Sequence, residues 1–267
     1  MKSYSGPWVI KPSNSSGQRG ISYFNDTSNL EKLFHDAIAY ATDNKAIIEQ
    51  FLEGPEINVC AVVSDGHVKF LSVADRVTIP DKNFGIAISH VYPSLLNTAQ
   101  IEKVKNVSQK AIKAIGLTNG IAYPQFIVNQ NGAWVMEIAA RMPGGNNREV
   151  ALYTSGIDMV KVAVNQAMGI KPDFNDKDAE TFPATTVRFI TRNDIPETIE
   201  SISSVDGIEN ARQLPNVKEV FMYLKEGQKI PDLKNSTARF GGIIAVGNER
   251  NTAIATAEKA FKMIQIK

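Results

Sequence analysis

Cysteine, histidine and net charge are all scarce in this chain of 267 residues. It holds one cysteine, Cys60, and three histidines, and its 29 Lys and Arg nearly balance 28 Asp and Glu, for a net charge of +1. One cysteine cannot form an internal disulfide, which excludes a secreted disulfide scaffold. The histidines lack metal-ligand spacing. No block of Lys and Arg stands out, so neither a nucleic-acid partner nor an electrostatically bound membrane is expected.

Long apolar runs are absent as well, because no stretch approaches the ~18 residues of a membrane span. The chain is nevertheless 43% hydrophobic and 21% charged, a composition that can bury a sizeable core. At ~150 residues per domain, the length predicts one large domain or two smaller ones. A globular, cytoplasmic enzyme or binding domain is therefore expected.

Apolar alternation and helical periodicity predict a mixed order of elements. Strands are expected over 8–11, 21–24, 46–52, 57–63, 68–77, 121–128, 133–139, 184–191, 217–224 and 240–246. Helices are expected over 29–42, 97–116 and 157–168. Two further helical segments are expected, one that ends at 152 and one that follows 251.

Local signals support several of these boundaries. A capping-box spacing opens the helices that follow Ser28 and Asn97. Asp65-Gly66 joins two apolar runs and predicts a hairpin, because glycine supplies a positive φ. Residues 81–93 are interpreted as a loop carrying His90. The polar connector 173–180 is the best internal boundary.

Lys11 ends a predicted strand and is followed by the loop Ser13-Asn-Ser-Ser-Gly-Gln-Arg-Gly20. The N–H groups and hydroxyls of such a loop can cradle phosphate oxygens. The order differs from a P-loop, since the lysine precedes the glycines. Taken alone, the loop is more typical of a surface hairpin.

A second stretch runs from Glu49 to Glu56 at the end of a predicted strand. The backbone of residues 50–52 can present donors and acceptors to a flat heterocycle. Glu49 could accept from an exocyclic amine, and Glu56 from a vicinal diol. The alternative interpretation is a solvated, acidic strand end.

A third stretch is the hairpin from Gln125 to Glu137, which continues to Arg141. Period-two alternation predicts Phe126, Val128, Trp134 and Met136 as one set of apolar partners, with the strand register left open by one residue. Glu137 and Arg141 need partners, because an unpaired buried charge is costly. Mg²⁺ and a phosphate could supply them, and a mutual ion pair is the alternative.

In this order, the three stretches resemble the ATP-grasp superfamily of carboxylate–amine or carboxylate–thiol ligases. The resemblance is carried by Val-Ile-Lys11-Pro with its loop, by Ile-Ile-Glu49-Gln-Phe-Leu52-Glu-Gly-Pro-Glu56 and by Val-Met-Glu137-Ile-Ala-Ala-Arg141-Met-Pro-Gly-Gly145. Residues 184–267, with Ala238-Arg-Phe-Gly-Gly-Ile-Ile-Ala-Val-Gly247, resemble the small C-terminal domain of the amino-acid-ligase and purine-biosynthetic branches.

The resemblance implies an α/β (α+β) ATP-grasp fold, in which two α+β subdomains clasp ATP beside a small C-terminal α+β domain. The implied divisions are a lid subdomain over 1–55, a large subdomain with the metal-binding strands over 56–180, and the C-terminal domain over 181–267. Family members carry a further N-terminal domain, so this chain is expected to be the C-terminal portion of a longer enzyme.

The resemblance also implies nucleotide-binding roles for Lys11, Ser15, Ser16, Gly17, Glu49, Gln50, Phe51, Leu52, Glu56 and Met136. Lys11 is expected at the phosphates, Glu49 at the adenine amine and Glu56 at the ribose. The Leu52 N–H is expected at an adenine ring nitrogen. Met136 is expected under the adenine face, with an ordinary core methionine as the alternative.

Metal and catalytic roles follow from the same resemblance. Glu137 and Gln125 are the implied Mg²⁺ ligands, and Arg141 with Lys11 is implied to stabilise the transferred phosphoryl group. Two positions depart from the family pattern. Gln125 stands where a carboxylate is usual, and Ala139 stands where Asn is frequent. A carbonyl oxygen without charge is expected to hold Mg²⁺ more weakly.

The implied function is an ATP- and Mg²⁺-dependent ligase, with Mn²⁺ as an alternative ion. It joins a small carboxylic acid to an amine or amino acid through an acyl phosphate. The alternative is an ATP-binding module without ligase activity of its own. Arg76, His90 and Arg148 are candidate substrate contacts, although each is more typical of an ordinary loop residue. These patterns do not determine the oligomeric state, and a homodimer is one of the alternatives.

Overall fold

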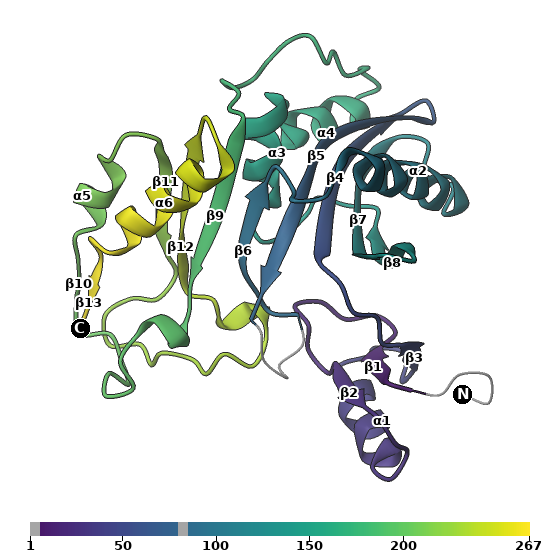
Figure 1. Ribbon diagram of the computed structural model, residues 1–267, viewed down its shortest axis with the longest axis horizontal. Coiled ribbons are helices and arrows are strands. Elements are labelled where there is room, and N and C mark those ends of the chain that lie inside the picture. The colour runs from purple at the N-terminus through teal and green to yellow at the C-terminus, as the bar shows by residue number, and fades with distance from the viewer. Residues whose placement is uncertain (1–5, 80–84) are drawn as a thin grey trace.

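The computed structural model describes residues 6–79 and 85–267 (Figure 1). The strands are β1 (Trp8–Pro12), β2 (Ser22–Phe24), β3 (Ala46–Gln50), β4 (Glu56–Ser64), β5 (His67–Thr78), β6 (Ala87–Tyr92), β7 (Gly120–Asn129), β8 (Gly132–Ala139), β9 (Ala184–Ile190), β10 (Val205–Asp206), β11 (Val217–Met222), β12 (Gly241–Gly247) and β13 (Gln265–Ile266). The helices are α1 (Leu30–Ile38), α2 (Thr98–Ala114), α3 (Asn147–Ser155), α4 (Met159–Ala167), α5 (Ile208–Arg212) and α6 (Arg250–Phe261), with short 3₁₀ turns η1 (Arg192–Asp194) and η2 (Ser236–Ala238).

A small subdomain projects below the main body of the molecule (Figure 1). Its sheet has the order β2-β1-β3, and both pairings of β1 are antiparallel. Alternate residues of β1 are buried, which places Trp8 and Ile10 against Phe24 and Ala37 of α1. The loop of 13–20 therefore leaves the small sheet at the end of β1 and returns to it at β2.

The predicted capping box at Ser28 is wrong, although the helix itself is present. Asn29 is the N-cap residue of α1, and its side chain makes no capping hydrogen bond. The Ser28 hydroxyl donates to the Asp26 carboxylate instead. The helix also ends at Ile38, four residues before the expected limit of 42. Short-range competition from an aspartate thus removed the cap that the spacing predicted.

The main sheet has the strand order β11-β12-β9-β6-β5-β4-β7-β8, and all its pairings are antiparallel. Alternation along β4 serves two helical layers. Ile57 and Val59 pack in the cluster that includes α2, whereas Cys60 and Val62 pack beneath α3 and α4. Asn58 points to the same side as Cys60, so the α3 face of the sheet carries a polar group at this end.

Local predictions in the main body are largely confirmed. Asn97 accepts from the Gln100 N–H at 2.9 Å, and the Gln100 side chain accepts from the Asn97 N–H at 3.0 Å, a complete capping box. Asp65 and Gly66 have φ values of 49° and 78° and join β4 to β5 as a hairpin. Within the described residues, no helix is both long and apolar enough to cross a membrane.

The prediction of a loop over 81–93 is wrong where it covers β6. Residues 81–84 lie outside the described residues, but 87–92 form a strand paired with both β5 and β9. His90 therefore lies on a central strand, where it is 2% exposed. His90 interrupts the apolar pattern because it faces the cleft and its polar network, whereas the hydroxyl of the adjacent Ser89 donates to the Val187 carbonyl oxygen of β9.

The sheet continues across the position where the sequence suggested a boundary. β9 begins at Ala184, just beyond the connector 173–180, and pairs with β6 over four residues. β12 and β11 follow in the same sheet. The C-terminal strands thus extend the large sheet, and the division at 180/181 stays a prediction.

Gly54 links the small subdomain to the main sheet, and its replacement by Ala is expected to be costly. Its φ is 149°, and an added Cβ would lie 2.4 Å from the Val128 carbonyl oxygen. We expect the free energy of unfolding to fall by about 1–3 kcal/mol, as measured by urea denaturation. Gly66→Ala is the matched control, since Gly66 also has a positive φ but open space around it. Equal losses in the two variants would contradict the steric argument.

Candidate active site

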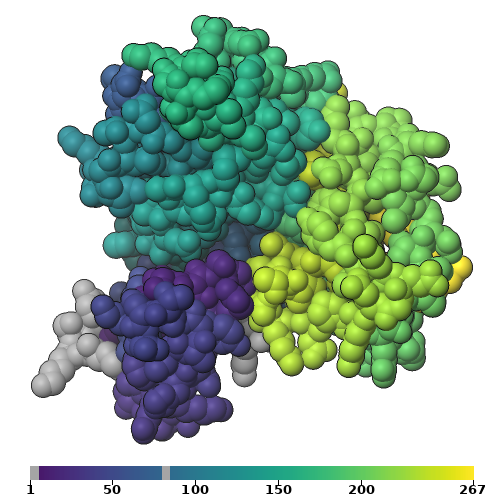
Figure 2. Space-filling view, turned by 180° about the vertical axis from the view of Figure 1, so that it is seen from behind, coloured from purple at the N-terminus to yellow at the C-terminus, as the bar shows by residue number. Residues whose placement is uncertain are grey.

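A continuous cleft lies between the small subdomain and the end of the main sheet. It consists of two adjoining cavities of about 550 and 400 Å³. Both are lined by Lys11, Glu49, Gln125, Met136 and Glu137. In Figure 2 the small subdomain abuts the main body on one side and the C-terminal segment on another. Every residue for which the sequence predicted a nucleotide, metal or catalytic role lines one or both cavities.

The smaller cavity is lined largely by apolar surface. Phe51 and Leu52 line it from the hinge after β3, and Met136 lines it from β8. Gln50 and Glu56 lie at the same cavity. An apolar slot bordered by backbone and two glutamates has the chemistry required for a nucleoside.

Trp134 also lines this cavity, and here the predicted apolar set is wrong. The register of β7 and β8 pairs Trp134 with Ile127 and not with Phe126, because the pairing of the two strands has a bulge between Gln125 and Phe126. Phe126 and Val128 are buried against the α2 layer, whereas the Trp134 ring is 43% exposed at the cleft. A register slip of one residue moves a side chain to the other face of a sheet.

Lys11 connects the small subdomain to the main sheet. Its Nζ lies 2.5 Å from Glu49 Oε2 and donates to the Met136 carbonyl oxygen at 3.2 Å. A phosphate placed here would therefore meet an ammonium already directed into the cleft. The pair is open to water, with the Glu49 side chain 45% exposed, so its own contribution to stability is small.

The loop that follows Lys11 is closed onto the C-terminal part of the chain. The Ser236 N–H at η2 donates to the Gly17 carbonyl oxygen at 3.1 Å, and the Ser236 hydroxyl donates to the Gln18 side chain. Gln18 also donates to the Gly85 carbonyl oxygen. Within this loop the Ser15 hydroxyl is buried, and among the described residues it has no hydrogen-bond partner. An orphaned hydroxyl in a glycine-rich loop suits an oxygen-rich ligand such as a triphosphate.

Gln125 and Glu137 face each other across β7 and β8. The Gln125 amide donates both hydrogens, to Asn58 Oδ1 at 2.9 Å and to Tyr123 Oη at 3.1 Å, and its carbonyl oxygen has no partner among the residues that the structure describes. Across residues 6–79 and 85–267, no cluster of three or more His, Cys, Asp or Glu could hold a metal. One carboxylate and one carbonyl, completed by nucleotide phosphates, nevertheless fit the oxygen ligation that Mg²⁺ prefers.

Arg141 reaches the larger cavity from the loop after β8. Its Nη1 donates to the Met142 carbonyl oxygen at 2.8 Å, and none of the ion pairs among the described residues joins it to Glu137. The mutual ion pair considered from the sequence is therefore not formed. Both charges stay available to a ligand.

The three candidate substrate contacts have different surroundings. Arg76 and His90 line the larger cavity. Arg76 is ion-paired with Glu56 and also donates to the Gly85 carbonyl oxygen. Arg148 lines neither cavity, and its Nη2 is ion-paired with Asp158 Oδ2 at 2.8 Å. It holds α3 to the N-cap of α4.

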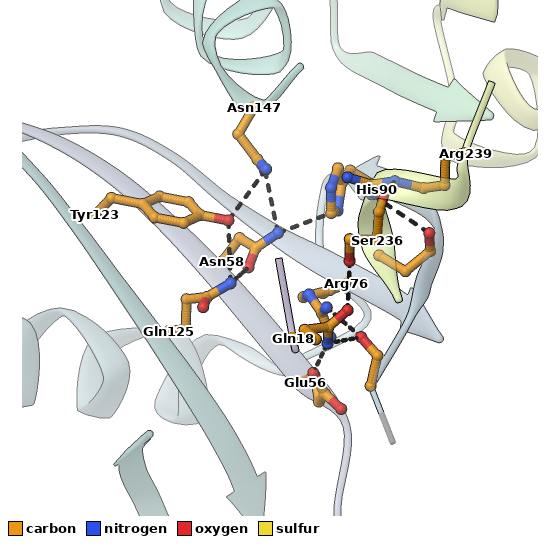
Figure 3. A network of polar contacts seen from close by, with 12 residues as sticks. Gln18, Glu56, Asn58, Arg76, His90, Tyr123, Gln125, Asn147, Ser236 and Arg239 are labelled. Atoms are coloured by element: carbon orange, nitrogen blue, oxygen red, sulfur yellow. Dashed lines mark hydrogen bonds and ion pairs between the residues drawn. The ribbon is translucent and has the colours of Figure 1, made fainter. Parts of the chain in front are cut away.

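A buried polar network lies behind the cleft, and most of its residues follow no recognisable sequence pattern (Figure 3). Asn58 Nδ2 donates to Asn147 Oδ1 and lies 3.1 Å from His90 Nδ1. Asn147 Nδ2 donates to Tyr123 Oη at 3.1 Å and to the Gly144 carbonyl oxygen at 2.9 Å. Asn58 and Asn147 are each 1% exposed. Lone asparagines in β4 and α3 have no spacing that could have marked them.

Arg239 is the second feature that sequence reasoning missed. It follows η2 and lines the larger cavity, with its guanidinium 4.0 Å from the centre of the Phe189 ring. It donates to the Ser236 and Ala87 carbonyl oxygens. No Asp or Glu among the described residues forms an ion pair with it. Burial, together with the nearby Arg76, lowers the pKa of Arg239 to about 10.

His90 is neutral for related reasons. Burial lowers its pKa well below 6.5, and the positive charges of Arg76 and Arg239 lower it further. Phe189 packs edge-on against the ring, with 5.4 Å between ring centres. The wall of the larger cavity thus combines a neutral imidazole with a guanidinium that lacks a counterion within the described chain.

The buried His90 is expected to make stability depend on pH below 6.5. Its pKa is lower in the folded protein, so the unfolded chain binds more protons in the interval between the two pKa values. The free energy of unfolding should be fully present above pH 6.5 and fall by about 1 kcal/mol near pH 5.5. Urea denaturation of the wild type and His90→Asn at both pH values checks this, because the variant should lose most of the slope. His67→Asn, which removes an exposed imidazole, is the control, and an unchanged slope in His90→Asn would refute the assignment.

Comparison with known families decides the relationship. Residues 1–173 match the family described as the carbamoyl-phosphate synthase L chain, ATP binding domain. This match covers well over half of the chain. The chain belongs to the ATP-grasp family. Residues 201–267 also match the L-amino acid ligase C-terminal domain 2.

The curated relatives are distant in sequence. A D-alanine–D-alanine ligase from Halothermothrix orenii is 30% identical over 146 residues, which cover 52% of this chain and 41% of that protein. An uncharacterised Sinorhizobium fredii protein, y4rH, is 23% identical over 97% of this chain and 52% of its own length. This chain thus spans about half the length of these two relatives.

Solved structures confirm the predicted ATP-grasp fold. An L-amino acid ligase from Bacillus licheniformis superposes with a TM-score of 0.79 at 20% identity, covering 99% of this chain and 64% of that one. A biotin carboxylase from Campylobacter jejuni, in complex with a β,γ-ATP ligand, gives 0.76 at 20% identity, covering 100% and 59%. At this identity the likeness concerns the fold alone.

Proposed function

We propose that the whole protein is an ATP- and Mg²⁺-dependent ligase that activates a small carboxylate as an acyl phosphate and joins it to an amine. Membership of the ATP-grasp family supports ATP-dependent ligation in general terms. The single observation that carries the substrate class is Arg239, a partly buried guanidinium that forms no ion pair with a carboxylate of the described chain. A cation that is partly removed from water is stabilised by an anionic partner. A substrate carboxylate in the larger cavity supplies one.

The nucleotide is proposed to occupy both cavities. Its base lies in the apolar slot with Glu49 at the exocyclic amine, Glu56 at the ribose and the Leu52 N–H at a ring nitrogen. Its phosphates lie between Lys11 and the loop that Ser236 holds closed. A bound Mg²⁺ would neutralise phosphate charge, with Glu137 and the Gln125 carbonyl oxygen as its protein ligands.

In the proposed reaction, a carboxylate oxygen attacks the γ-phosphorus of ATP, and the bond from that phosphorus to the bridging oxygen breaks to release ADP. Arg239 and the neutral His90 orient the carboxylate beside the γ-phosphoryl group. Lys11 and Arg141 stabilise the charge on the transferred group. An amine then attacks the acyl carbon, loses a proton, and phosphate leaves. The closed loop keeps water from the acyl phosphate.

The test uses ATP with Mg²⁺ and, in parallel, Mn²⁺, together with panels of amino acids and other small acids, and follows ADP, phosphate and ligated product by mass spectrometry. Carboxylates labelled with ¹⁸O make the test specific. An acyl phosphate requires one labelled oxygen to appear in the released phosphate for each product formed. Product without label transfer would refute the acyl phosphate, and the absence of product with every acid and amine would refute ligase activity.

The alternative is an ATP-binding module without activity of its own, and Gln125 is the observation in its favour. If the site had decayed from a carboxylate pair, Gln125→Glu should raise metal affinity and activity. The structure favours the opposite result. A glutamate would direct acceptor oxygens at Asn58 Oδ1 and remove both hydrogen bonds that the amide donates. We expect Gln125→Glu to lower stability and leave turnover no higher.

A further inference from the structure

We propose that Asn58 is a positioning residue that fixes the Nε2–H tautomer of His90 and turns the Gln125 carbonyl oxygen toward the cleft. This inference rests on the proposed function, because it concerns the same site. Asn58 comes from β4, His90 from β6 and Gln125 from β7 (Figure 3). The Asn58 amide therefore contacts both His90, on the side proposed for the carboxylate, and Gln125, on the side proposed for the metal.

Donor and acceptor accounting fixes the orientation of each amide. The Asn58 oxygen accepts from Gln125 Nε2 at 2.9 Å. Its nitrogen has two hydrogens and two neighbours, Asn147 Oδ1 and His90 Nδ1, each at 3.1 Å. An amide nitrogen can only donate, so His90 Nδ1 must accept. A neutral imidazole that accepts at Nδ1 carries its proton on Nε2.

Asn147 prevents the reverse arrangement. Its nitrogen donates to the Gly144 carbonyl oxygen at 2.9 Å, and a backbone carbonyl can only accept. Asn147 Oδ1 must therefore face Asn58, which forces Asn58 to present its nitrogen there. The tautomer of His90 is thus determined by the Gly144 carbonyl oxygen, through hydrogen bonds that pass by way of Asn147 and Asn58.

The network consumes all six amide hydrogens of Asn58, Gln125 and Asn147 within itself and on Gly144. What it leaves for a ligand is a carbonyl oxygen on Gln125 and an N–H donor on His90. An added Cβ on Gly145 would lie 3.1 Å from His90 Nε2, so this donor lies beside the glycine pair at the larger cavity. A donor beside Arg239 suits a carboxylate oxygen, whereas an acceptor there would repel it.

Two-bond ¹H–¹⁵N NMR of histidine ring nitrogens tests the proposal on the full chain. There are three histidines, so His35→Asn and His67→Asn assign the spectrum. At pH above 7 the wild-type His90 signal should show an unprotonated Nδ1 and a protonated Nε2. In Asn58→Asp, a carboxylate oxygen replaces the amide nitrogen and must accept, so Nδ1 should become protonated. Asn251→Asp, at an exposed position, should leave the His90 signals unchanged.

Kinetics supply the functional arm. Asn58→Asp should raise KM for the carboxylate about tenfold, the scale of one misdirected hydrogen bond, with KM for ATP within about twofold. A wild-type His90 protonated at Nδ1, or averaging between tautomers, would overturn the proposal even if Asn58→Asp failed to fold. So would a folded Asn58→Asp with the wild-type pattern. If no acid is ever ligated, the proposed function fails, but the NMR result still decides the role of Asn58.

Discussion

Replacing Glu137 by Gln is expected to lower the rate of ATP-dependent ligation by ~10²–10³-fold, the scale seen when one preorganised charge-stabilising group is removed. Glu137 is the only carboxylate opposite Gln125 on the paired strands, and no cluster of three acidic or metal-ligating residues within the described chain could take over. The variant would keep the shape of the site and the hydrogen-bonding oxygen but lose the charge.

The rate should be measured as a function of Mg²⁺ concentration, with Glu226→Gln as the control at an exposed position. We expect the Glu137→Gln curve to shift to higher Mg²⁺ and to reach a lower maximum, while the control matches the wild type. Metal-free binding of ADP, followed by calorimetry, should be little changed. A Glu137→Gln enzyme with wild-type Mg²⁺ dependence would refute the assigned role.

Replacing Arg239 by Met is expected to have two opposite effects. KM for the carboxylate substrate should rise by about 10–100-fold, because a charge-assisted hydrogen bond contributes roughly 1.5–3 kcal/mol. The free energy of unfolding should rise by on the order of 1 kcal/mol, since a partly buried guanidinium without a carboxylate partner among the described residues is replaced by an apolar chain. Residues that serve binding at the expense of stability show this combination.

Steady-state kinetics and urea denaturation of the same preparation check both effects. Arg212→Met is the matched control, because Arg212 lies in the same C-terminal segment but pairs with Glu209 at 2.5 Å and is exposed. We expect this control to leave KM unchanged and stability equal or lower. A fall in stability for Arg239→Met with no change in KM would mean that Arg239 is only a packing residue.

Comparison of the sequence with the structure shows which kinds of residue could be predicted. The hairpin at Asp65-Gly66 and the capping box at Asn97 depend on neighbours along the chain, and both are confirmed. The predicted cap at Ser28 does not form, because the Ser28 hydroxyl donates to the nearby Asp26 carboxylate instead. The placement of Trp134 failed because a single bulge changed the register between β7 and β8.

The sequence by itself determined the contiguous parts of the site. Lys11 with its loop, the hinge from Glu49 to Glu56 and the strand from Glu137 to Arg141 are each short segments whose chemistry depends on adjacent residues. Their order along the chain was enough to predict the ATP-grasp fold that the comparisons confirm. Where these segments meet in one cleft, the structure agrees with that order.

Only the tertiary structure decided what surrounds the larger cavity. Asn58, His90, Asn147 and Arg239 come from β4, β6, α3 and the turn before β12, and no local pattern links them. The strand order β9-β6-β5-β4-β7 brings them together. Their surroundings of low dielectric constant then give them their properties. His90 stays neutral there, an anion would stabilise the Arg239 charge, and an amide hydrogen without an acceptor would be costly.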